Sequence, residues 1–485
     1  MVNYKKILLK NPYSPTYWLV LGLIVKGILF LGVILNHPYR DILGIWGATM
    51  GDDSSYLDPI DNLLQYGTYS HDFRMPGYGL FYLLFRLIFA QPGACNALII
   101  LQLLLASTSV YYLALTALNI FKNNAIFYIA FYLFIFCSFS NFFDAYIGSE
   151  SLCTSLLIFS VYFFTKYFNE QKSKYLFIAG LLATWTMFIR PVFGGLVVAC
   201  SILILCQNGK LKIHIKHAFL FLIPFLICEG SWIYRNFQIH KKFIPFTTTG
   251  SFYPNAATSY LQPLFEFVQS WGGVCSFTNK STDLDWFQYR YPGLLHPIIH
   301  YDSLSDNIYT SAFNKDSLLR LKKLIVALQN PSLDTTTASS YQHELRAKLY
   351  IYKLSVKREK PFAYYVKAPL KMVCVMLYGP ATRNYLDRGQ VIPFLGRFIV
   401  AFNYLIYFII LISGLIGSVC LIIIGIKQCS SIFIIAFIPL YIILVHPFML
   451  RFFDNRFLMP AFPFLIISSA YILVKLSKQN IPSNR

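Results

Sequence analysis

Repeated apolar stretches constrain the fold of this chain more than any other feature of its sequence. Many approach the roughly 18–20 residues that a helix needs to cross a lipid bilayer. The first, TYWLVLGLIVKGILFLGVIL, covers residues 16–35. No small-residue cleavage site follows it, so we interpret it as a retained span and not as a signal peptide. Of the 485 residues, 56% are hydrophobic and 13% are charged, about half the charged share of a soluble domain. We therefore predict an all-α polytopic membrane protein.

The positions of lysine and arginine predict how the chain crosses the membrane. Lys5, Lys6 and Lys10 precede the first span, and short basic connections lie at 166–174 and 210–217. Cytoplasmic loops carry an excess of these residues, so we expect both chain ends and both connections on the inside. About ten transmembrane helices satisfy this expectation, at residues 16–35, 95–120, 124–141, 149–168, 174–190, 191–207, 217–236, 398–426, 431–447 and 457–475.

Two further apolar stretches must not cross the membrane if this count is to hold. Residues 76–90 are too short for a span, and residues 361–380 contain Pro369 together with Lys367 and Lys371. Both stretches suit amphipathic helices that lie in the membrane interface. We predict an N-terminal transmembrane module at 1–236 with a first outer loop at 36–94, an outer loop or small domain at 237–397, and C-terminal transmembrane helices at 398–485.

Short helices are predicted within the outer segments. Tyr56, Ile60, Leu63 and Leu64 recur at helical spacing, and Gly67 follows as a C-cap. Amphipathic patterns also predict helices at 315–330 and 341–357 in the long outer segment 237–360.

Charge and cysteine content exclude several classes of function. The net charge of +20 would suggest nucleic acid in a soluble protein, but in a membrane protein it reflects topology, with a contribution from an anionic lipid substrate. The ten cysteines form no CxxC motif and no disulfide framework. The sequence has no P-loop, no GxGxxG turn and no HExxH motif. We predict no cofactor and no metal site, although a divalent cation stays an open alternative.

Several motifs occur in a recognisable order on the predicted outer face. An acidic pair and a tyrosine in GDDSSY (51–56) are followed by the helix and by FRMPGYGLFYLLF (73–85). This pattern resembles GT-C superfamily glycosyltransferases, above all protein O-mannosyltransferases and bacterial lipid A aminoarabinose transferases. Three later segments are similar to other motifs of that family, namely DAYIGSESL (144–152), the Trp-x-x-Arg-Asn segment that begins SWIYRNF (231–237), and DNRFLMPAFPFLI (454–466).

The resemblance implies a glycosyltransferase that uses a polyprenyl-phosphate sugar donor. Asp52 maps to the family's catalytic acidic residue, and Asp53 stands where many members have Glu. Arg74 takes the place of a lysine that contacts the lipid phosphate. The acceptor hydroxyl or amine needs a carboxylate to take its proton, and the leaving phosphate needs preset cations. One essential carboxylate suits an inverting displacement. A retaining mechanism would need a second carboxylate close to the sugar, and Glu150 or Asp53 could supply it.

Other residues are weaker candidates, each with a structural alternative. Asp53 or Ser54 could cap the helix and leave Asp52 for chemistry. Glu229 and Lys26 lie inside predicted spans, where we expect Glu229 to pair with Arg235 or Lys26. The further candidates for substrate contact could instead pack, cap a helix or anchor the chain in the interface; they are Tyr56, Arg74, Glu150, Arg190, Arg235, Arg451 and Arg456.

The expected partners are a polyprenyl-phosphate sugar, a glycan, lipid or protein acceptor, and the bilayer, without nucleic acid. We expect a bacterial cell inner membrane with the active site on the outer face. One alternative is an envelope polysaccharide polymerase or ligase, in which arginines rather than an aspartate are essential. A lipid-linked sugar transporter or flippase is another, although we find no paired halves. A catalytically inactive binding partner is the third.

Overall fold

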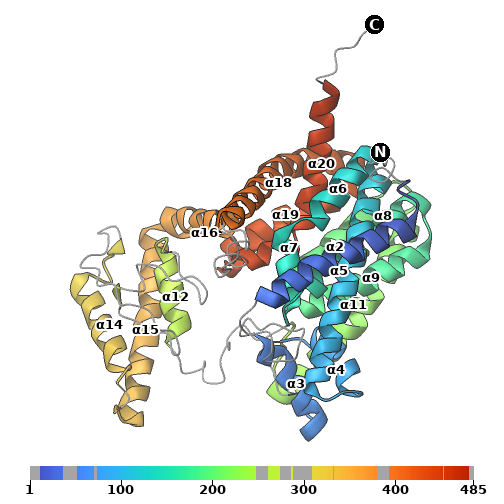
Figure 1. The fold of residues 1–485 in the computed structure, drawn as a ribbon. Coiled ribbons are helices and arrows are strands. Elements are labelled where there is room, and N and C mark those ends of the chain that lie inside the picture. The colour runs from blue at the N-terminus through green and yellow to red at the C-terminus, as the bar shows by residue number, and fades with distance from the viewer. Residues whose placement is uncertain are drawn as a thin grey trace. The chain divides into compact units, whose positions relative to one another are not determined.

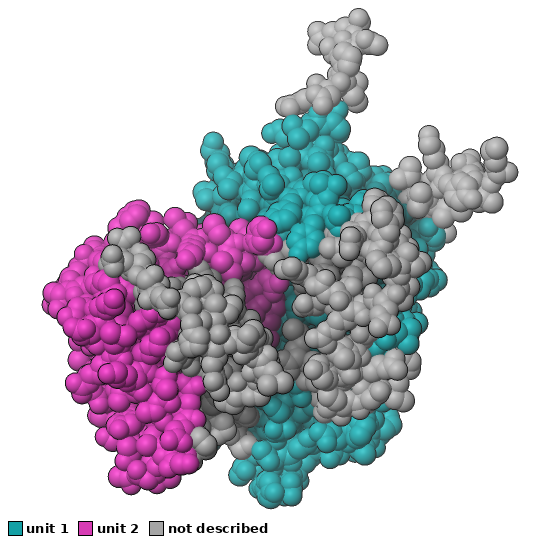
Figure 2. All heavy atoms as spheres, turned by 60° about the vertical axis from the view of Figure 1, so that its left-hand side comes forward, with its two compact units in different colours: residues 1–248, 380–441, 459–485 teal, residues 249–379, 442–458 magenta. Residues whose placement is uncertain are grey.

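The computed structural model describes residues 11–36, 52–69, 74–246, 260–273, 286–287, 308–330, 332–378, 393–451 and 453–479. The remaining parts of the predicted outer loop 36–94 and of the outer segment 237–360 lie outside this description. The chain divides into two compact units (Figure 2). Unit 1 comprises residues 1–248, 380–441 and 459–485, and unit 2 comprises residues 249–379 and 442–458. The predicted division at residues 236 and 397 stays a prediction.

Unit 1 is built from helices, most of them apolar (Figure 1). Within the described residues, six helices of the chain are long and apolar enough to cross a membrane, and four shorter apolar helices accompany them. Their positions agree with the ten predicted spans, so the predicted polytopic helical fold is confirmed. The helices are α2 (Pro15–Asn36), α3 (Asp53–Tyr66), α4 (Gly79–Arg86), α5 (Gln91–Phe121), α6 (Asn124–Ile135), α7 (Ser138–Phe143), α8 (Ser149–Glu170), α9 (Ser173–Ile189), the 3-10 helix η1 (Pro191–Phe193), α10 (Gly194–Leu205), α11 (Leu211–His240), α18 (Pro393–Gln428), α19 (Ile432–Leu444) and α20 (Phe462–Gln479).

Some predicted spans differ in detail from the helices that form. The span expected at 124–141 breaks after Ile135, and the six-residue helix α7 follows it. The stretch 76–90 forms only the eight-residue helix α4. At a rise of about 1.5 Å per residue, this helix is too short to cross a bilayer.

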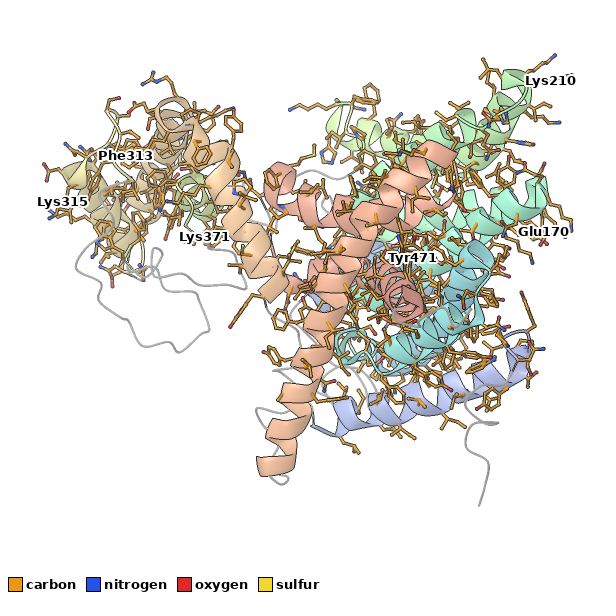
Figure 3. All side chains as sticks on the ribbon, turned by 90° about the horizontal axis from the view of Figure 1, so that it is seen from above. Glu170, Lys210, Phe313, Lys315, Lys371 and Tyr471 are labelled. Atoms are coloured by element: carbon orange, nitrogen blue, oxygen red, sulfur yellow. The ribbon has the colours of Figure 1, made fainter. Side chains whose placement is uncertain are left out.

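Close helix contacts in unit 1 depend on small residues. A Cβ added to Gly180 of α9 would overlap the backbone of Phe221 on α11. Likewise, Gly417 of α18 lies against the backbone of Ser468 on α20. Small residues at such contacts let apolar helices approach closely where lipid removes the hydrophobic drive for association. In Figure 3, the residues Glu170 and Lys210, which stand at the connections α8–α9 and α10–α11, both lie at the right-hand edge of unit 1.

Unit 2 has an apolar core of its own. The predicted helices at 315–330 and 341–357 are present as α14 (Lys315–Ala327) and α15 (Thr335–Glu359). The other elements of unit 2 are α12 (Leu261–Ser270), the π-helix η3 (Ala363–Lys367), α16 (Ala368–Tyr378), the π-helix η4 (Val445–Leu450) and the 3-10 helix η5 (Asn455–Leu458). The core includes Leu264, Phe267 and Val268 of α12, Leu318, Leu321 and Ile325 of α14, and Leu345, Leu349 and Val356 of α15.

Candidate active site

The first candidate residue, Asp52, lies directly before helix α3. The helix begins at Asp53, so Asp52 itself occupies the N-cap position, but its side chain makes no capping hydrogen bond. The expectation that Asp53 or Ser54 caps the helix is therefore wrong. Asp53 instead lies in the first turn, where the helix dipole favours a carboxylate. At the other end, Gly67 adopts φ +70° and its N–H donates to the carbonyl of Leu63, as predicted.

Arg74 joins the start of α3 from the following loop. Its Nη2 lies 3.8 Å from Oδ2 of Asp52, and its Nε donates to the hydroxyl of Ser55 at 3.1 Å. The guanidinium carbon is 4.3 Å from the ring centroid of Tyr56, which is a cation–π distance. Both side chains of the Asp52–Arg74 pair remain partly exposed. A carboxylate and a guanidinium thus lie side by side where solvent, or a substrate, can reach them.

Tyr56 connects this pair to a second, more buried one. Its hydroxyl donates to Oγ of Ser149 at 3.0 Å, and Nε of Arg190 donates to the same oxygen at 2.9 Å. Arg190 also forms an ion pair with Glu150, in which the side chains are 11% and 6% exposed. Glu150 lies in the first turn of α8, and Arg190 is the C-cap of α9. Burial of this pair indicates that breaking it would leave a charge without compensation.

A glycine contact fixes the loop that carries Arg74 against the end of α9. A Cβ on Gly77 would overlap the backbone of Phe188, and Nε1 of Trp185 donates to the Gly77 carbonyl at 3.0 Å. The hydroxyl of the next residue, Tyr78, donates to Gln102 on α5 at 2.8 Å. These contacts hold residues 74–78 close to Arg190, which follows α9 directly.

Arg235 of α11 contacts the same loop indirectly. Its Nη2 donates to the carbonyl of Tyr69 at 2.6 Å, and the Tyr69 hydroxyl donates to the carbonyl of Arg74 at 3.0 Å. Burial raises the pKa of Tyr69, although Arg235 and Arg74 oppose the shift. The phenol therefore stays protonated and able to donate at neutral pH. Arg235 therefore helps to hold the loop in place, and none of these contacts connects it directly to Asp52.

The two charged residues predicted to pair inside the membrane have other partners. Lys26 of α2 forms an ion pair with Asp144 at 2.7 Å, and this carboxylate also accepts from Ser151 at 2.6 Å. Glu229 of α11 accepts from the backbone N–H of Phe246 at 2.9 Å. The expected pairing of Glu229 with Arg235 or Lys26 is wrong, because the chain returns along α11 at 244–246 and supplies its own donor.

The last two candidate arginines belong to unit 2. Arg456 lies 3.7 Å from Asp454, whose carboxylate also accepts from the Arg456 backbone N–H at 3.0 Å. Arg451 donates to the carbonyl of Tyr364, and its guanidinium carbon is 4.5 Å from the Tyr364 ring centroid. These contacts lie within unit 2 and connect neither arginine to Asp52.

A family model described as dolichyl-phosphate-mannose-protein mannosyltransferase matches residues 75–234. The match confirms the resemblance to the GT-C superfamily. Comparison with curated protein sequences finds no significant match. The GT-C match begins one residue after Arg74, ends one residue before Arg235, and contains Glu150 and Arg190. It does not extend to Asp52, so the catalytic role of this residue still rests on the resemblance of its own motif.

Two solved structures align with nearly the whole chain. The archaeal oligosaccharyltransferase AglB from Archaeoglobus fulgidus, in complex with an inhibitory peptide and a dolichol-phosphate, is 13% identical, with a TM-score of 0.44 over 98% of this chain and 53% of AglB. The chain thus spans about half of the AglB length. ArnT from Cupriavidus metallidurans in the apo state is 12% identical, with a TM-score of 0.37 over 96% of this chain and 81% of ArnT. Neither likeness assigns a residue or a substrate to this chain.

Sequence reasoning on the GT-C motifs missed the hydroxyl groups that connect the candidates. Ser55, Ser149 and Tyr69 each bridge two predicted residues or hold one in place. Ser149 stands next to Glu150 in the quoted motif, so an adjacent hydroxyl was the available signal. Among the described residues, no group of three or more histidine, cysteine, aspartate or glutamate side chains could hold a metal ion. The cluster presents a carboxylate that can accept a proton and guanidinium groups that can bind an anion.

Proposed function

We propose that the chain is a membrane glycosyltransferase that moves a sugar from a polyprenyl-phosphate carrier to an acceptor at the outer face of the cytoplasmic membrane. One observation supports this function above the others. Five predicted residues from four segments of the chain, Asp52 and Tyr56, Arg74, Glu150 and Arg190, meet in a single cluster of hydrogen bonds, ion pairs and a cation–π contact. The cluster combines an accessible carboxylate with two guanidinium groups, which are the groups that transfer from a phosphate carrier needs.

In the proposed reaction, the acceptor hydroxyl gives its proton to the Asp52 carboxylate as its oxygen attacks the anomeric carbon. The bond between that carbon and the phosphate oxygen breaks, and the electron pair leaves with the phosphate. Arg74 and Arg190 stabilise the charge that develops there. A single displacement of this kind inverts the anomeric configuration. Glu150, which is paired with Arg190, orients that guanidinium and does not attack the sugar. The sequence predicts a donor-phosphate role for Arg451 and Arg456, and in this proposal Arg456 keeps it.

The reaction is tested with purified protein, radiolabelled polyprenyl-phosphate sugars and a membrane extract. We expect labelled product from the unsubstituted chain and a loss of about 10²–10⁴-fold in rate for Asp52→Asn, the usual contribution of a general base. Asp58→Asn is the matched control, since Asp58 is an exposed carboxylate on the same helix, and it should keep the activity. Absence of product with every donor, or full activity of Asp52→Asn, would refute the proposal.

Sidedness needs a separate measurement. Ser54 is exposed on α3, so Ser54→Cys can be labelled with a membrane-impermeant maleimide in vesicles of each orientation, with the unsubstituted chain as background. We expect extra labelling only where the outer face is accessible. Labelling only from the cytoplasmic face would contradict the outer-face assignment. It would not contradict the proposed transfer reaction, which the activity assay tests.

A further inference from the structure

Unit 2 contains a polar cavity that the proposed reaction at Asp52 does not use. Its volume is about 220 Å³, smaller than the roughly 300–1,000 Å³ typical of pockets for drug-sized ligands. Gln262, Glu266 and Gln269 line it from α12, and Lys353 lines it from α15. These two helices pack side by side (Figure 1). Tyr364 and Arg451 complete the polar part of the wall, so every lining group named belongs to unit 2.

The charged groups of the cavity are held in place but not fully satisfied. Nζ of Lys353 lies 2.6 Å from Oε2 of Glu266, and Nε2 of Gln262 donates to the other carboxylate oxygen at 3.1 Å. Arg451 uses one terminal nitrogen on the Tyr364 carbonyl. Its other terminal nitrogen, Nη1, is buried and has no hydrogen-bond partner within the part of the chain that the structure describes. A buried donor without an acceptor is costly, so a ligand oxygen at this position would be favoured.

The balance of groups indicates the chemistry of such a ligand. Two cations, Lys353 and Arg451, face one carboxylate, Glu266, so the cavity wall carries a net positive charge. Burial lowers the pKa of Arg451, although Tyr364 and Tyr365 oppose the shift. An arginine remains cationic in proteins even so. Amide groups from two glutamines and the Glu266 carboxylate add hydrogen-bond donors and acceptors that sugar hydroxyls can use. Arg451 also follows directly on the candidate span Ile432–Leu450, which puts the cavity near one end of that span.

We propose that this cavity binds one anionic sugar residue of a glycan acceptor, with its acidic group on Arg451 and its hydroxyls on the α12 side chains. That the bound sugar belongs to an acceptor rests on the proposed transferase function. The binding of an anionic sugar to the cavity does not depend on that function. It replaces the donor-phosphate role predicted for Arg451. The acidic group is a carboxylate or a phosphate attached to a sugar, and the experiment separates these from a free phosphate ester.

Binding is measured by saturation-transfer NMR on the full chain carrying Asp52→Asn, so that the result does not depend on catalysis. The probes are galacturonate, galactose, galactose 6-phosphate and glycerol 3-phosphate. We expect galacturonate or galactose 6-phosphate to bind about tenfold or more tightly than galactose, because a hydrogen bond to a charged group is the stronger kind. Equal binding of galactose would overturn the requirement for a charge. Equal binding of glycerol 3-phosphate would overturn the requirement for a sugar.

Three variants locate the binding. Arg451→Gln should lose about tenfold or more in affinity for the anionic sugar, with the thermal unfolding temperature measured alongside. Glu266→Gln should bind the anionic sugar roughly two- to fivefold more tightly, because it removes a repelling carboxylate and frees Lys353. A misfolded protein cannot give this gain. Arg320→Gln, on α14 and away from the cavity lining, is the matched control. A loss in Arg320→Gln equal to that in Arg451→Gln, or no gain in Glu266→Gln, would overturn the assignment.

Discussion

Two ion pairs of unit 1 are almost fully buried, whereas every ion pair described within unit 2 keeps more contact with solvent. In unit 1 the side chains of Lys26 and Asp144 are 1% and 2% exposed, and those of Arg190 and Glu150 are nearly as buried. In unit 2 the Arg320 side chain is 65% exposed beside Glu344, and the apolar core lies elsewhere, between α12, α14 and α15. Figure 3 labels Phe313 inside this unit and Lys315 at its edge.

The difference teaches how each unit depends on its charges. A buried pair contributes little net free energy when both partners are present, but it is costly to break, because one charge is then left without compensation. An exposed pair is screened by water and can be lost at small cost. We therefore expect unit 1 to be specified by its charge pairs and unit 2 by apolar packing. Four substitutions, from the largest expected effect to the smallest, test this comparison.

Asp144→Ala should have the largest effect on stability. It leaves Lys26 buried in α2 without its partner, which costs about 3–5 kcal/mol in comparable buried pairs. Unfolding in detergent micelles measures the change. The double variant Lys26→Met with Asp144→Leu should recover most of the loss, since no charge is then stranded. If Asp144→Ala unfolded like the unsubstituted chain, the claim that unit 1 depends on this pair would be wrong.

Leu349→Ala should come next, with a loss of about 2–5 kcal/mol confined to unit 2. Leu349 is fully buried on α15, and the substitution removes apolar contacts and leaves a cavity. Leu354→Ala on the same helix is the control, because Leu354 is 41% exposed. Hydrogen exchange should increase in α12 and α15 but not in α8. Equal increases in both units would show that they unfold together and would remove the basis of the comparison.

Ser151→Ala should cost about 1.5–3 kcal/mol, the usual contribution of a hydrogen bond to a charged group. The Ser151 hydroxyl donates to the buried Asp144 carboxylate at 2.6 Å. Ser155→Ala, which loses only a bond to a backbone carbonyl, should be affected less. The same detergent unfolding assay compares the two variants, and an equal loss in both would mean that the Asp144 charge adds nothing to the Ser151 bond.

Arg320→Gln should have the smallest effect, about 0.2–1 kcal/mol, and added salt should reduce it further. Hydrogen bonding to Lys348, more than the nearby charge of Arg320, lowers the pKa of Glu344. A lowered carboxylate pKa stabilises the fold above the unfolded-state value, about 4.3 for glutamate. This contribution is lost as the pH falls through the lower folded value. The free energy of unfolding should therefore differ between Arg320→Gln and the unsubstituted chain at neutral pH, and this difference should disappear at acidic pH.

Much of the fold and part of the candidate site could be predicted from local sequence. The apolar runs of α2, α5, α8 and α11 reach spanning length by composition alone. Gly67 was recognisable as a C-cap because a left-handed residue commonly ends a helix there. Asp52 and Arg74 lie close together in the structure. A family motif identifies both, and they are near each other in the chain.

The sequence by itself determined the membrane class, the helices and the residue types at the site, because apolar length and helical spacing are local properties. Only the tertiary structure decided the ion pair of Lys26 with Asp144 and the hydrogen bonds that join Tyr56, Ser149 and Arg190. It also decided that the Glu229 carboxylate accepts a hydrogen bond from the Phe246 backbone N–H. Most of these partners are tens of residues apart in the chain, and several alternative pairings satisfy the same charges. Helix packing selects among them, because a buried polar group is stabilised only by the partner that the fold brings within hydrogen-bonding distance.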